Sequence, residues 1–473
     1  MSMRSPRRLL GSAALLAVTL GSAGADPPDA EQAPGFIARW GGRTKDLGFG
    51  TAAGAKSVFV TGGTWSADFP VSAGKPPAGD AWCAFLTQLA RADGALARSI
   101  TLCGRGMTYG RAVARDGSDA AWVGGSSDGP DLPVSRNAFQ PRYHGGSAAG
   151  PGDAFIAHWN TGGQMDYVTY LGGAGDETVW AMASDGSGGV WAAGGTTSRP
   201  LAGGVGSLAG TMAWPDGFLA HITADRRLGA IKILGGDGVD ELYDVALVDP
   251  GRLVVVGATA SSDRVLGGPR GGLDGFVVLL DPATLKVAWT LRLGGVGADA
   301  LRGVTVVDGR RIVAAGHTDG GACQPRLGGR DGWLVSISLA GEVLRSDCVG
   351  SGTTDVLSDV AVAGDGVVWV TGTTDAALPH RAGSSRTTHH RAFVARARPT
   401  GGTGPLRLLS NEIAWGYAIT ADAEGRVYAV GETTAVPSTT GPWVAALHPT
   451  AGAFRGSYPP GSTDPYVIAL PPN

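Results

Sequence analysis

The stretch Val190-Trp191-Ala192-Ala193-Gly194-Gly195-Thr196 is a short apolar β-run that ends in Gly-x-Thr, and this ending recurs along the chain. Counting Ser as equivalent to Thr, the marker occurs seven times, at Val60–Thr64, Val123–Ser126, Ala193–Thr196, Val256–Thr259, Ala315–Thr318, Val370–Thr374 and Val430–Thr433. Gly62 of the first copy and Gly431 of the last are 369 residues apart, so the mean period is about 61 residues. A fixed period of this length indicates an array of supersecondary units, each long enough for four strands.

A second marker, Asp followed by a small residue and an aromatic one, comes after each of the first five copies. These are Asp80-Ala81-Trp82, Asp153-Ala154-Phe155, Asp216-Gly217-Phe218, Asp274-Gly275-Phe276 and Asp331-Gly332-Trp333. The sixth and seventh copies are eroded to Arg391-Ala392-Phe393 and Gly441-Pro442-Trp443. A third marker, Leu-Gly-Gly, opens several units, at Leu171–Gly173, Leu234–Gly236 and Leu293–Gly295.

Between these markers, paired apolar runs predict hairpins. Ala181-Met182-Ala183 and Val190-Trp191-Ala192, for example, flank Asp185-Gly186-Ser187-Gly188, which has Asp-Gly turn chemistry. No unit contains a convincing amphipathic helix. Four short strands cannot bury both faces of their sheet, whereas sheets stacked radially shield one another and leave few exposed edges. The predicted fold class is therefore all-β, a seven-bladed β-propeller with four antiparallel strands per blade.

We predict one propeller over residues 26–473. Its approximate repeats are 43–104, 105–173, 174–236, 237–295, 296–350, 351–410 and 411–458, with a C-terminal tail at 459–473. Both chain ends offer an additional outer strand that could close the ring, Phe36–Gly42 ahead of the first unit and Phe454–Tyr458 in the last. We favour the N-terminal segment, which would join the two chain ends in one blade.

Composition agrees with this fold and excludes others. The chain holds 79 Gly and 28 Pro among 473 residues, a share too high for a mostly helical protein. Its 43% hydrophobic and 17% charged residues provide ample apolar surface to bury, which excludes a disordered chain. The formal net charge is −3, with no basic cluster beyond the N-terminus, so we expect no nucleic-acid partner.

These motifs resemble those of the SBBP-type repeat proteins, bacterial exported proteins named for a seven-bladed β-propeller. The resemblance is closest at Tyr170–Asp176, at Thr64–Pro70, and at Asn137–Pro141 leading into Gly146 and Asp153–Ile156. It extends over essentially the whole mature chain and weakens in the last two units. It implies the propeller fold and says little about activity, because the family has no general catalytic assignment.

Residues 1–25 have the plan of a secretory signal peptide. Arg4, Arg7 and Arg8 precede an apolar run, and Ala23-Gly24-Ala25 suits cleavage after Ala25. The Arg7-Arg8 pair leaves the twin-arginine route open beside the Sec route. We therefore expect an exported protein, located at the cell surface, in the periplasm or outside the cell. No later apolar segment is long enough to cross a membrane, and we expect a monomer without a membrane span.

The four cysteines are an even set in a chain that we expect to be exported, so disulfides are permitted. Cys83 and Cys103 lie at equal distances from a turn near Asp93 and should face each other across a hairpin. Cys348 closes a similar strand, and Cys323 lies in the loop that leads into the same hairpin. We predict the pairs Cys83–Cys103 and Cys323–Cys348.

Several units carry an acidic residue just before their first strand, at Asp46, Asp176, Asp240, Asp299 and Asp355. Because these positions lie on crossings between blades, Asp176, Asp240, Asp299 and Asp355 could encircle one mouth of the central channel and bind Ca²⁺. The alternative, which we weight more heavily, is that periodic Asp residues accept hydrogen bonds from turn amides. On either interpretation no cofactor is required.

The longest loop of the second unit is a candidate ligand-binding site. It contains Phe139, Arg142, Tyr143 and His144, and an aromatic side chain next to Arg suits glycans or peptides. Much of this loop also matches the repeat, so packing is the alternative explanation.

Histidines suggest one further site. His380, His389 and His390 cluster in a loop of the sixth unit and are the best candidates for a metal or an anion, with a solvated variable loop as the alternative. His158 and His221 hold one strand position in neighbouring units, where packed sheets lie about 10 Å apart, too far for one metal. We interpret those two as repeat residues.

The predicted function is that of a secreted, non-enzymatic binding or scaffolding module whose partner is an unidentified protein or glycan. No convergent set of catalytic residues is visible. The alternative is a secreted hydrolase or lyase acting on polysaccharide through carboxylates at the channel mouth. Two non-repeating carboxylates within about 10 Å in one pocket would favour the enzyme, and evenly spaced hydrogen-bonded ones the scaffold.

Overall fold

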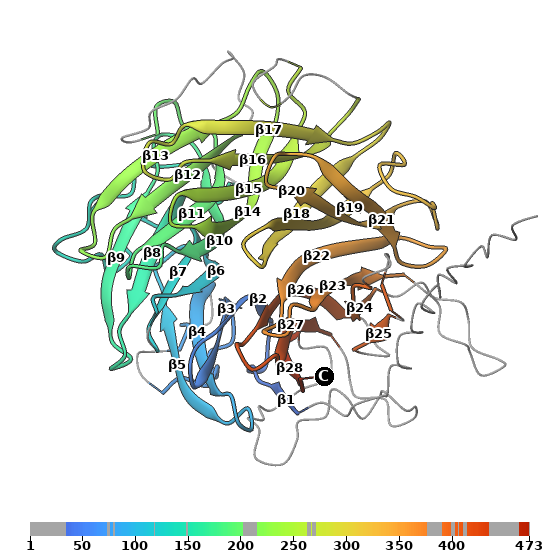
Figure 1. Ribbon diagram of the computed structural model, residues 1–473. Coiled ribbons are helices and arrows are strands. Elements are labelled where there is room, and N and C mark those ends of the chain that lie inside the picture. The colour runs from blue at the N-terminus through green and yellow to red at the C-terminus, as the bar shows by residue number, and fades with distance from the viewer. Residues whose placement is uncertain are drawn as a thin grey trace, which may run out of the picture. The chain divides into compact units, whose positions relative to one another are not determined.

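Seven antiparallel sheets of four strands each follow one another around a ring (Figure 1). They belong to the unit Ala33–Asn473 of the computed structural model. The structure describes residues 35–72, 76–78, 81–117, 119–147, 150–201, 215–262, 266, 271–375, 390–398, 403–404, 406–409, 414–434 and 463–472. Within these ranges, no helix has the length and apolar character needed to cross a membrane. The predicted all-β seven-bladed propeller is confirmed.

Each blade has an inner strand next to the channel, two middle strands and an outer strand. The inner strands, which contact one another around the ring, are β2 (Asp46–Ala53), β6 (Thr108–Arg115), β10 (Glu177–Ser184), β14 (Asp240–Asp249), β18 (Asp299–Val307), β22 (Asp355–Val362) and β26 (Ala414–Ala421). The second strands are β3 (Ser57–Thr64), β7 (Ala121–Ser127), β11 (Val190–Thr196), β15 (Arg252–Thr259), β19 (Arg311–Thr318), β23 (Val368–Thr374) and β27 (Val427–Thr433). The third strands are β4 (Cys83–Ala90), β8 (Asp153–Trp159), β12 (Asp216–Ile222), β16 (Asp274–Leu280), β20 (Asp331–Ser338), β24 (Arg391–Arg396) and β28 (Asp464–Leu470). The outer strands are β5 (Leu96–Leu102), β9 (Met165–Leu171), β13 (Leu228–Leu234), β17 (Val287–Leu293), β21 (Val343–Val349), β25 (Arg407–Leu408) and β1 (Phe36–Arg39).

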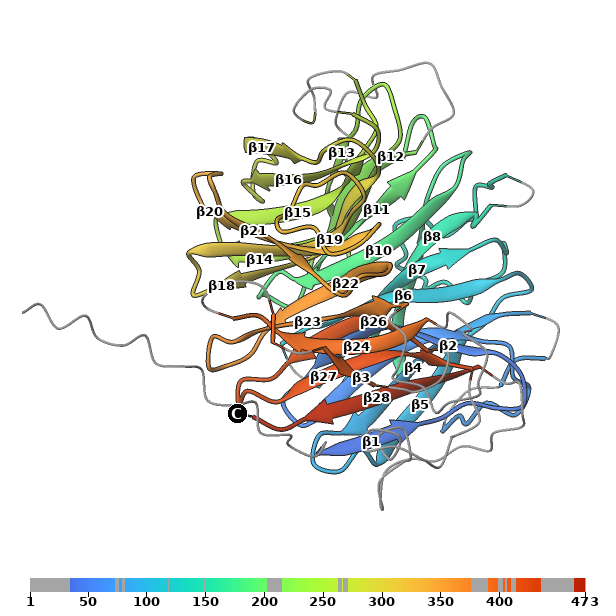
Figure 2. The same ribbon diagram turned by 90° about the vertical axis from the view of Figure 1, so that its right-hand side faces the viewer.

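The core lies between the blades. Middle strands such as β3 and β16 are buried at every position, because a neighbouring sheet covers each of their faces and both alternating sets of side chains are shielded. Among the described residues, seven clusters of buried apolar side chains fill the seven interfaces between blades. In one of them, Trp122 of the second blade packs with Phe218 of the third. Figure 2 shows the sheets stacked face against face.

A close approach of two backbones explains the glycine of the Gly-x-Thr marker. A Cβ atom on Gly62 would lie 1.7 Å from the carbonyl oxygen of Leu47, and one on Gly194 would lie 1.9 Å from that of Thr178. Clashes with the inner strand at 2.0 Å or less would occur equally at Gly125, Gly257, Gly316, Gly372 and Gly431. Only glycine fits there, since any other residue would force the first two strands of the blade apart.

The two chain ends close the ring, as we favoured. Strand β1 is the outer strand of the seventh blade and pairs with β28, and a buried ion pair of 2.7 Å joins Arg39 to Asp464. The predicted tail at 459–473 is therefore wrong, because Asp464–Leu470 form the third strand of this blade and bury their side chains in its core.

The error has a physical reason. The sequence between β27 and β28 is long, so the seventh copy of the second marker is Asp464-Pro465-Tyr466 and stands well beyond the expected Gly441–Trp443. The Gly441–Trp443 and Phe454–Tyr458 segments lie outside the described residues, as does the predicted signal peptide at 1–25.

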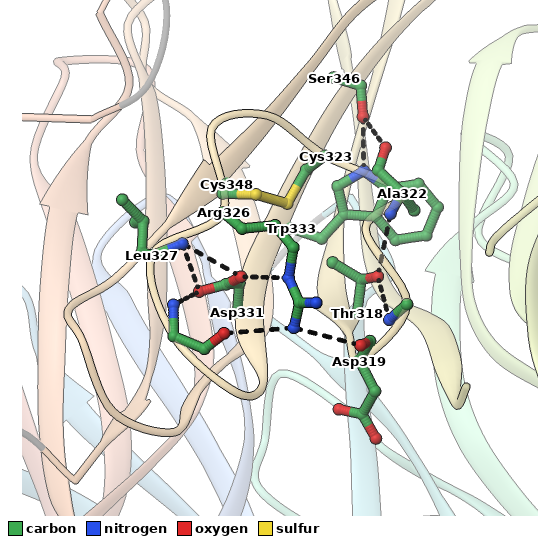
Figure 3. The surroundings of a disulfide bond; sticks show 12 residues. Thr318, Asp319, Ala322, Cys323, Arg326, Leu327, Asp331, Trp333, Ser346 and Cys348 are labelled. Carbon is green, nitrogen blue, oxygen red and sulfur yellow. Dashed lines mark hydrogen bonds and ion pairs between the residues drawn. A yellow bond between two sulfur atoms is a disulfide. The ribbon is translucent and has the colours of Figure 1, made fainter. Parts of the chain in front are cut away.

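Both predicted disulfides are present. Cys83–Cys103 joins the β4–β5 hairpin, with Cα atoms 4.5 Å apart. Cys323–Cys348 fastens the loop after β19 to the outer strand β21, with Cα atoms 5.0 Å apart (Figure 3). Beside the second bridge, the carboxylate of Asp331 accepts a hydrogen bond of 2.7 Å from the amide of Gly328. The two bridges thus fix blade edges, where a hydrogen-bonded ladder has strands on one side only.

Candidate ligand-binding site in the central channel

Each inner strand contains a β-bulge at the same place, three residues after the strand begins. There the register with the second strand skips one residue, and the skipped residues are Phe49, Arg111, Trp180, Tyr243, Arg302, Ser358 and Tyr417. A bulge bends its strand and changes the direction of the side chain that it carries. All seven bulge residues line one cavity of about 630 Å³, bounded by the inner strands.

The cavity has the size and the lining of a small-molecule site. Its volume falls within the range of about 300–1,000 Å³ that is usual for ligand pockets. Four of the bulge residues are aromatic, and hydroxyl groups are added by Thr51, Thr354, Ser358 and Thr373. Aromatic faces interspersed with polar groups suit a ligand that has both apolar faces and hydroxyl groups.

Arg111 is enclosed by aromatic rings. Its guanidinium carbon lies 4.3 Å from the ring centre of Phe49 and 5.3 Å from that of Trp180, which belong to the two neighbouring blades. The Nε atom is buried and has no hydrogen-bond partner in the described part of the chain. Burial lowers the pKa of Arg111, because a low-dielectric setting disfavours the charged form. Arg111 is thus a cation that contacts aromatic rings and forms no ion pair in the described part of the chain, while Glu432 attracts it electrostatically from beyond ion-pair distance.

An aromatic strip continues from Arg111 toward the surface. The guanidinium carbon lies 5.2 Å from the ring of Tyr109, Tyr109 lies 5.1 Å from Trp82, and Trp82 lies 5.5 Å from Trp65. Trp65 is 38% exposed, a large value for so big an apolar side chain. Ring faces are therefore available both inside the channel and beside it.

Tyr417 and Glu432 form a polar pair on the other side of Phe49. The ring of Tyr417 lies 5.4 Å from that of Phe49, and its hydroxyl donates a hydrogen bond of 3.0 Å to Glu432. Burial raises the pKa of Glu432 to about 7. The hydrogen bond from Tyr417 and the positive charge of Arg111 lower this pKa, but by less than burial raises it. Glu432 is the variable residue of the seventh Gly-x-Thr marker.

Blade five contributes a second basic group. Arg302 is exposed and lies with its guanidinium carbon 5.0 Å from the ring centre of Tyr243. Two further lining residues are His317 and Arg330, and Arg330 forms a two-pronged ion pair with Asp319 at 2.7 and 2.8 Å. His317 is only 5% exposed, and burial, followed by the charges of Arg302 and Arg330, lowers its pKa to about 4. His317 is therefore neutral near pH 7.

Two carboxyl groups, Asp244 and Asp359, line the same cavity directly after their bulges. One oxygen of Asp244 accepts the amide of Val304 in the next blade at 2.6 Å, and one of Asp359 accepts that of Ile419 at 2.8 Å. In each case the other oxygen accepts the amide of the following residue. Burial raises the pKa of Asp359 to about 7 and that of Asp244 well above its usual value, the latter helped by the charge of Asp359.

The acidic residues predicted at the starts of the inner strands accept hydrogen bonds from turns. Asp240, Asp299 and Asp355 are buried, and each accepts the amide four residues earlier at 2.7 Å. Asp176 accepts the amides of Ser147 and Gly152 at 3.1 Å, and its neighbour Glu177 holds the equivalent repeat position. The alternative that we weighted more heavily, hydrogen bonding to turn amides, is thus what the contacts show.

These four carboxylates do not gather into one group. In the described part of the chain, the cluster of three side chains of metal-ligating type consists of Cys323, Asp331 and Cys348, two of which form a disulfide. Calcium binding at Asp176, Asp240, Asp299 and Asp355 stays a prediction.

The aromatic side chains of the blade-two loop pack against the hydrophobic core. Phe139 is partly buried against one core cluster, and Tyr143 lies 5.8 Å from Tyr170 and packs on another. The amide of His144 donates a hydrogen bond to Asp153 at 2.9 Å, while Arg142 is exposed. None of the four lines the channel cavity. Ligand binding by this loop stays a prediction.

Of the three clustered histidines, His390 lines the channel cavity and forms an ion pair of 2.7 Å with Asp375. His380 and His389 lie outside the described residues. His158 and His221 occupy equivalent positions, opposite Trp122 and Trp191 of the neighbouring strands, as expected for repeat residues. Each is bound to carboxylates of its own surroundings, His158 to Asp116 and Asp166 and His221 to Asp185.

The bulge residues were not predicted, although the sequence carries a signal for them. Counting three residues on from the acidic position that opens an inner strand reaches Phe49 from Asp46, Trp180 from Glu177 and Arg302 from Asp299. The residue types at these positions differ from blade to blade, whereas the markers of the repeat recur. The repeat pattern therefore does not indicate the residues that line the channel.

No family model matches this sequence, and no curated protein matches it either. Among solved structures, the hydrazine synthase of Kuenenia stuttgartiensis is similar, with 11% identity, a TM-score of 0.33, and coverage of 86% of this chain and 80% of that one. A neuraminidase-like protein of A/little yellow-shouldered bat/Guatemala is similar with 9% identity, a TM-score of 0.38, and coverage of 76% and 93%. Neither likeness is close enough to bear on a ligand or an activity.

Proposed function

We propose that this chain is an exported, non-enzymatic binding protein that holds an acidic glycan in its central channel. The observation that carries the proposal is Arg111, a cation enclosed by aromatic rings that forms no ion pair in the described part of the chain. The acidic group that attracts it, Glu432, has a pKa raised to about 7 by burial and compensates its charge only in part. An enclosed charge that forms no ion pair costs free energy. A ligand carboxylate would supply a counter-charge through charge-assisted hydrogen bonds.

The glycan class follows from the rest of the lining. Sugar rings present an apolar face that stacks on aromatic side chains, and their hydroxyl groups need hydrogen-bonding partners. Trp180 and Phe49 flank Arg111 with such faces, and Ser358 and Thr373 add hydroxyl groups. The partly exposed Trp65 offers another ring face beside the channel.

The proposal is tested by screening the mature chain against acidic and neutral glycans and measuring affinities by calorimetry. We expect Arg111→Gln to weaken binding of an acidic glycan at least about tenfold, since a hydrogen bond to a charged group contributes about 1.5–3 kcal/mol. Arg227→Gln is the matched control, because Arg227 is 81% exposed and lies in the turn of the blade-three hairpin. Equal affinities of Arg111→Gln and wild type for every bound glycan would contradict the proposal.

A second candidate function is hydrolysis of a polysaccharide, and Asp244 and Asp359 favour it. They are two carboxyl groups in one cavity that do not recur in the other blades, and burial raises the pKa of each. Acid–base catalysis uses such pairs. Against it, both oxygens of each carboxyl group are already occupied by backbone amides. Turnover of a polysaccharide that is lost in Asp359→Asn would establish the enzyme.

We also propose that the chain is exported and belongs with the SBBP-type repeat proteins. The support for export is the pattern of residues 1–25 together with two disulfides, which persist in oxidising compartments. The support for the family is the match of repeat motifs, now joined by a seven-bladed ring. Amino-terminal sequencing of the exported protein tests cleavage after Ala25.

A further inference from the structure

The channel holds a second basic group across the ring from Arg111. Arg302 occupies the bulge position of the fifth blade and Arg111 that of the second, so two blades lie between them in one direction and three in the other. Like Arg111, Arg302 lies over an aromatic ring, that of Tyr243. In the described part of the chain, Arg302 forms no ion pair and no hydrogen bond, so its charge faces the cavity uncompensated.

Two side chains support Arg302. Arg330 also lines the cavity, and Asp319 holds its guanidinium in place through two contacts. Only 5% of the His317 surface is exposed, and its Nδ1 has no hydrogen-bond partner among the described residues. Buried polar atoms are nearly always hydrogen-bonded, so such an atom in a cavity wall marks a place where a ligand or a water belongs.

Among the described residues, no carboxyl group forms an ion pair with Arg111 or Arg302. Glu432 attracts Arg111 electrostatically, but burial raises the pKa of Glu432 to about 7. Asp375 is paired with His390. The oxygens of Asp244 and Asp359 are occupied by backbone amides, and burial favours the neutral form of both carboxyl groups. The cavity therefore carries an excess of positive charge at two separate places on its wall, one in blade two and one in blade five.

We propose that Arg302, with Arg330 and His317, forms a second anion subsite, and that the channel thereby selects acidic oligosaccharides with at least two carboxylates over monoacids. This rests on the proposed function. A monoacid satisfies one subsite and leaves the other cation without a partner. A chain with two carboxylates satisfies both, and the second contact costs little additional entropy because the ligand is already held.

The test is a calorimetric titration with galacturonate and its oligomers of two to five units, against neutral malto-oligosaccharides of the same lengths. In the wild type we expect affinity to rise at least tenfold between the monomer and the shortest oligomer that reaches both subsites. In Arg302→Gln this rise should disappear while the affinity for the monomer stays within about twofold of the wild type. Because Arg302 is exposed, we expect this variant to fold like the wild type, and an unchanged melting temperature would verify this.

Arg227→Gln is the matched control, because it removes the charge of an arginine that is 81% exposed in the turn of the blade-three hairpin; it should retain the rise. The second subsite is refuted if Arg302→Gln weakens monomer and oligomers by the same factor, or weakens neither. In that event, a loss of binding in Arg111→Gln still supports the proposed function. If the wild type binds the neutral sugars as tightly as the acidic ones, or binds no uronate at all, both proposals fail together.

Discussion

The start of each inner strand and the bulge three residues later lie on one strand, yet they have opposite characters. Five of the seven starting residues are acidic, and all five are buried and bound to a turn or to the marker Thr: Asp46, Glu177, Asp240, Asp299 and Asp355. The seven bulge residues include two Arg, two Tyr, one Phe, one Trp and one Ser. Recurrent positions on the inner strands therefore hold the ring together, and divergent positions face the channel.

Breaking a recurrent contact should have the largest effect. A Cβ atom on Gly194 would clash with the carbonyl oxygen of Thr178, so we expect Gly194→Ala to lower the free energy of unfolding by about 3 kcal/mol or to prevent folding. Gly329→Ala is the control, because its Cβ would meet nothing within 4 Å. Urea denaturation measures both, and equal stabilities of the two variants would contradict the role given to the marker glycine.

Removing an acidic residue at the start of an inner strand should destabilise the protein somewhat less than Gly194→Ala does. Asp240 accepts hydrogen bonds from the amide of Gly236 at 2.7 Å and from the hydroxyl of Ser261 at 2.6 Å. Asp240→Ala leaves these buried donors without their acceptor, and we expect a loss of about 2 kcal/mol in the same assay. Asp240→Asn keeps a hydrogen-bond acceptor and should therefore lose less stability than Asp240→Ala. A calcium-dependent stability that Asp240→Ala abolishes would instead support the cation site.

Glu432 should make the stability of the protein depend on pH. It belongs to a recurrent marker, but its carboxylate accepts a hydrogen bond from the bulge residue Tyr417. Its pKa is about 7 in the folded chain and 4.5 when unperturbed, so the folded chain binds the proton more tightly. The stability from this group is fully present below pH 4.5 and is lost as pH rises toward 7. We expect Glu432→Gln to remove a decline on the order of 1–2 kcal/mol between pH 5 and pH 8.

The difference between Glu432→Gln and the wild type isolates this contribution, because Asp153 and Asp359, whose pKa values burial also raises to about 7, act with the same sign in both proteins. Chemical denaturation at the two pH values measures it. Parallel pH profiles of the two proteins would contradict the buried, protonated state of Glu432.

Changing a bulge residue should affect stability least. We expect Arg302→Gln to alter the free energy of unfolding by less than about 0.5 kcal/mol, because the side chain is exposed and carries no ion pair in the described part of the chain. Thermal unfolding checks this. A loss as large as that of Asp240→Ala would mean that the bulge residues hold the ring as well, and the comparison would break down.

Residues near one another in the chain were predictable. Cys83 and Cys103 flank one hairpin, and the turn geometry that brings them together is local. The bulge residues were not recognised, because a bulge arises from how an inner strand lies on its neighbour and the residue types at the bulge differ from blade to blade. Only their fixed spacing from the start of the strand marks them in the sequence. The third strand of blade seven was misplaced for a related reason, since a long connection separates Asp464 from its partner Thr433.

The number of blades, the four-stranded units and the disulfide pairs follow from local sequence, because period, alternation and turn chemistry act over a few residues and repeat. The local sequence does not reveal which side chains face the channel, how the chain ends join, or that Arg111 and Arg302 form no ion pair in the described part of the chain. Those properties depend on contacts between blades, where residues about 60 positions apart share one environment, and burial and charge compensation are properties of that environment.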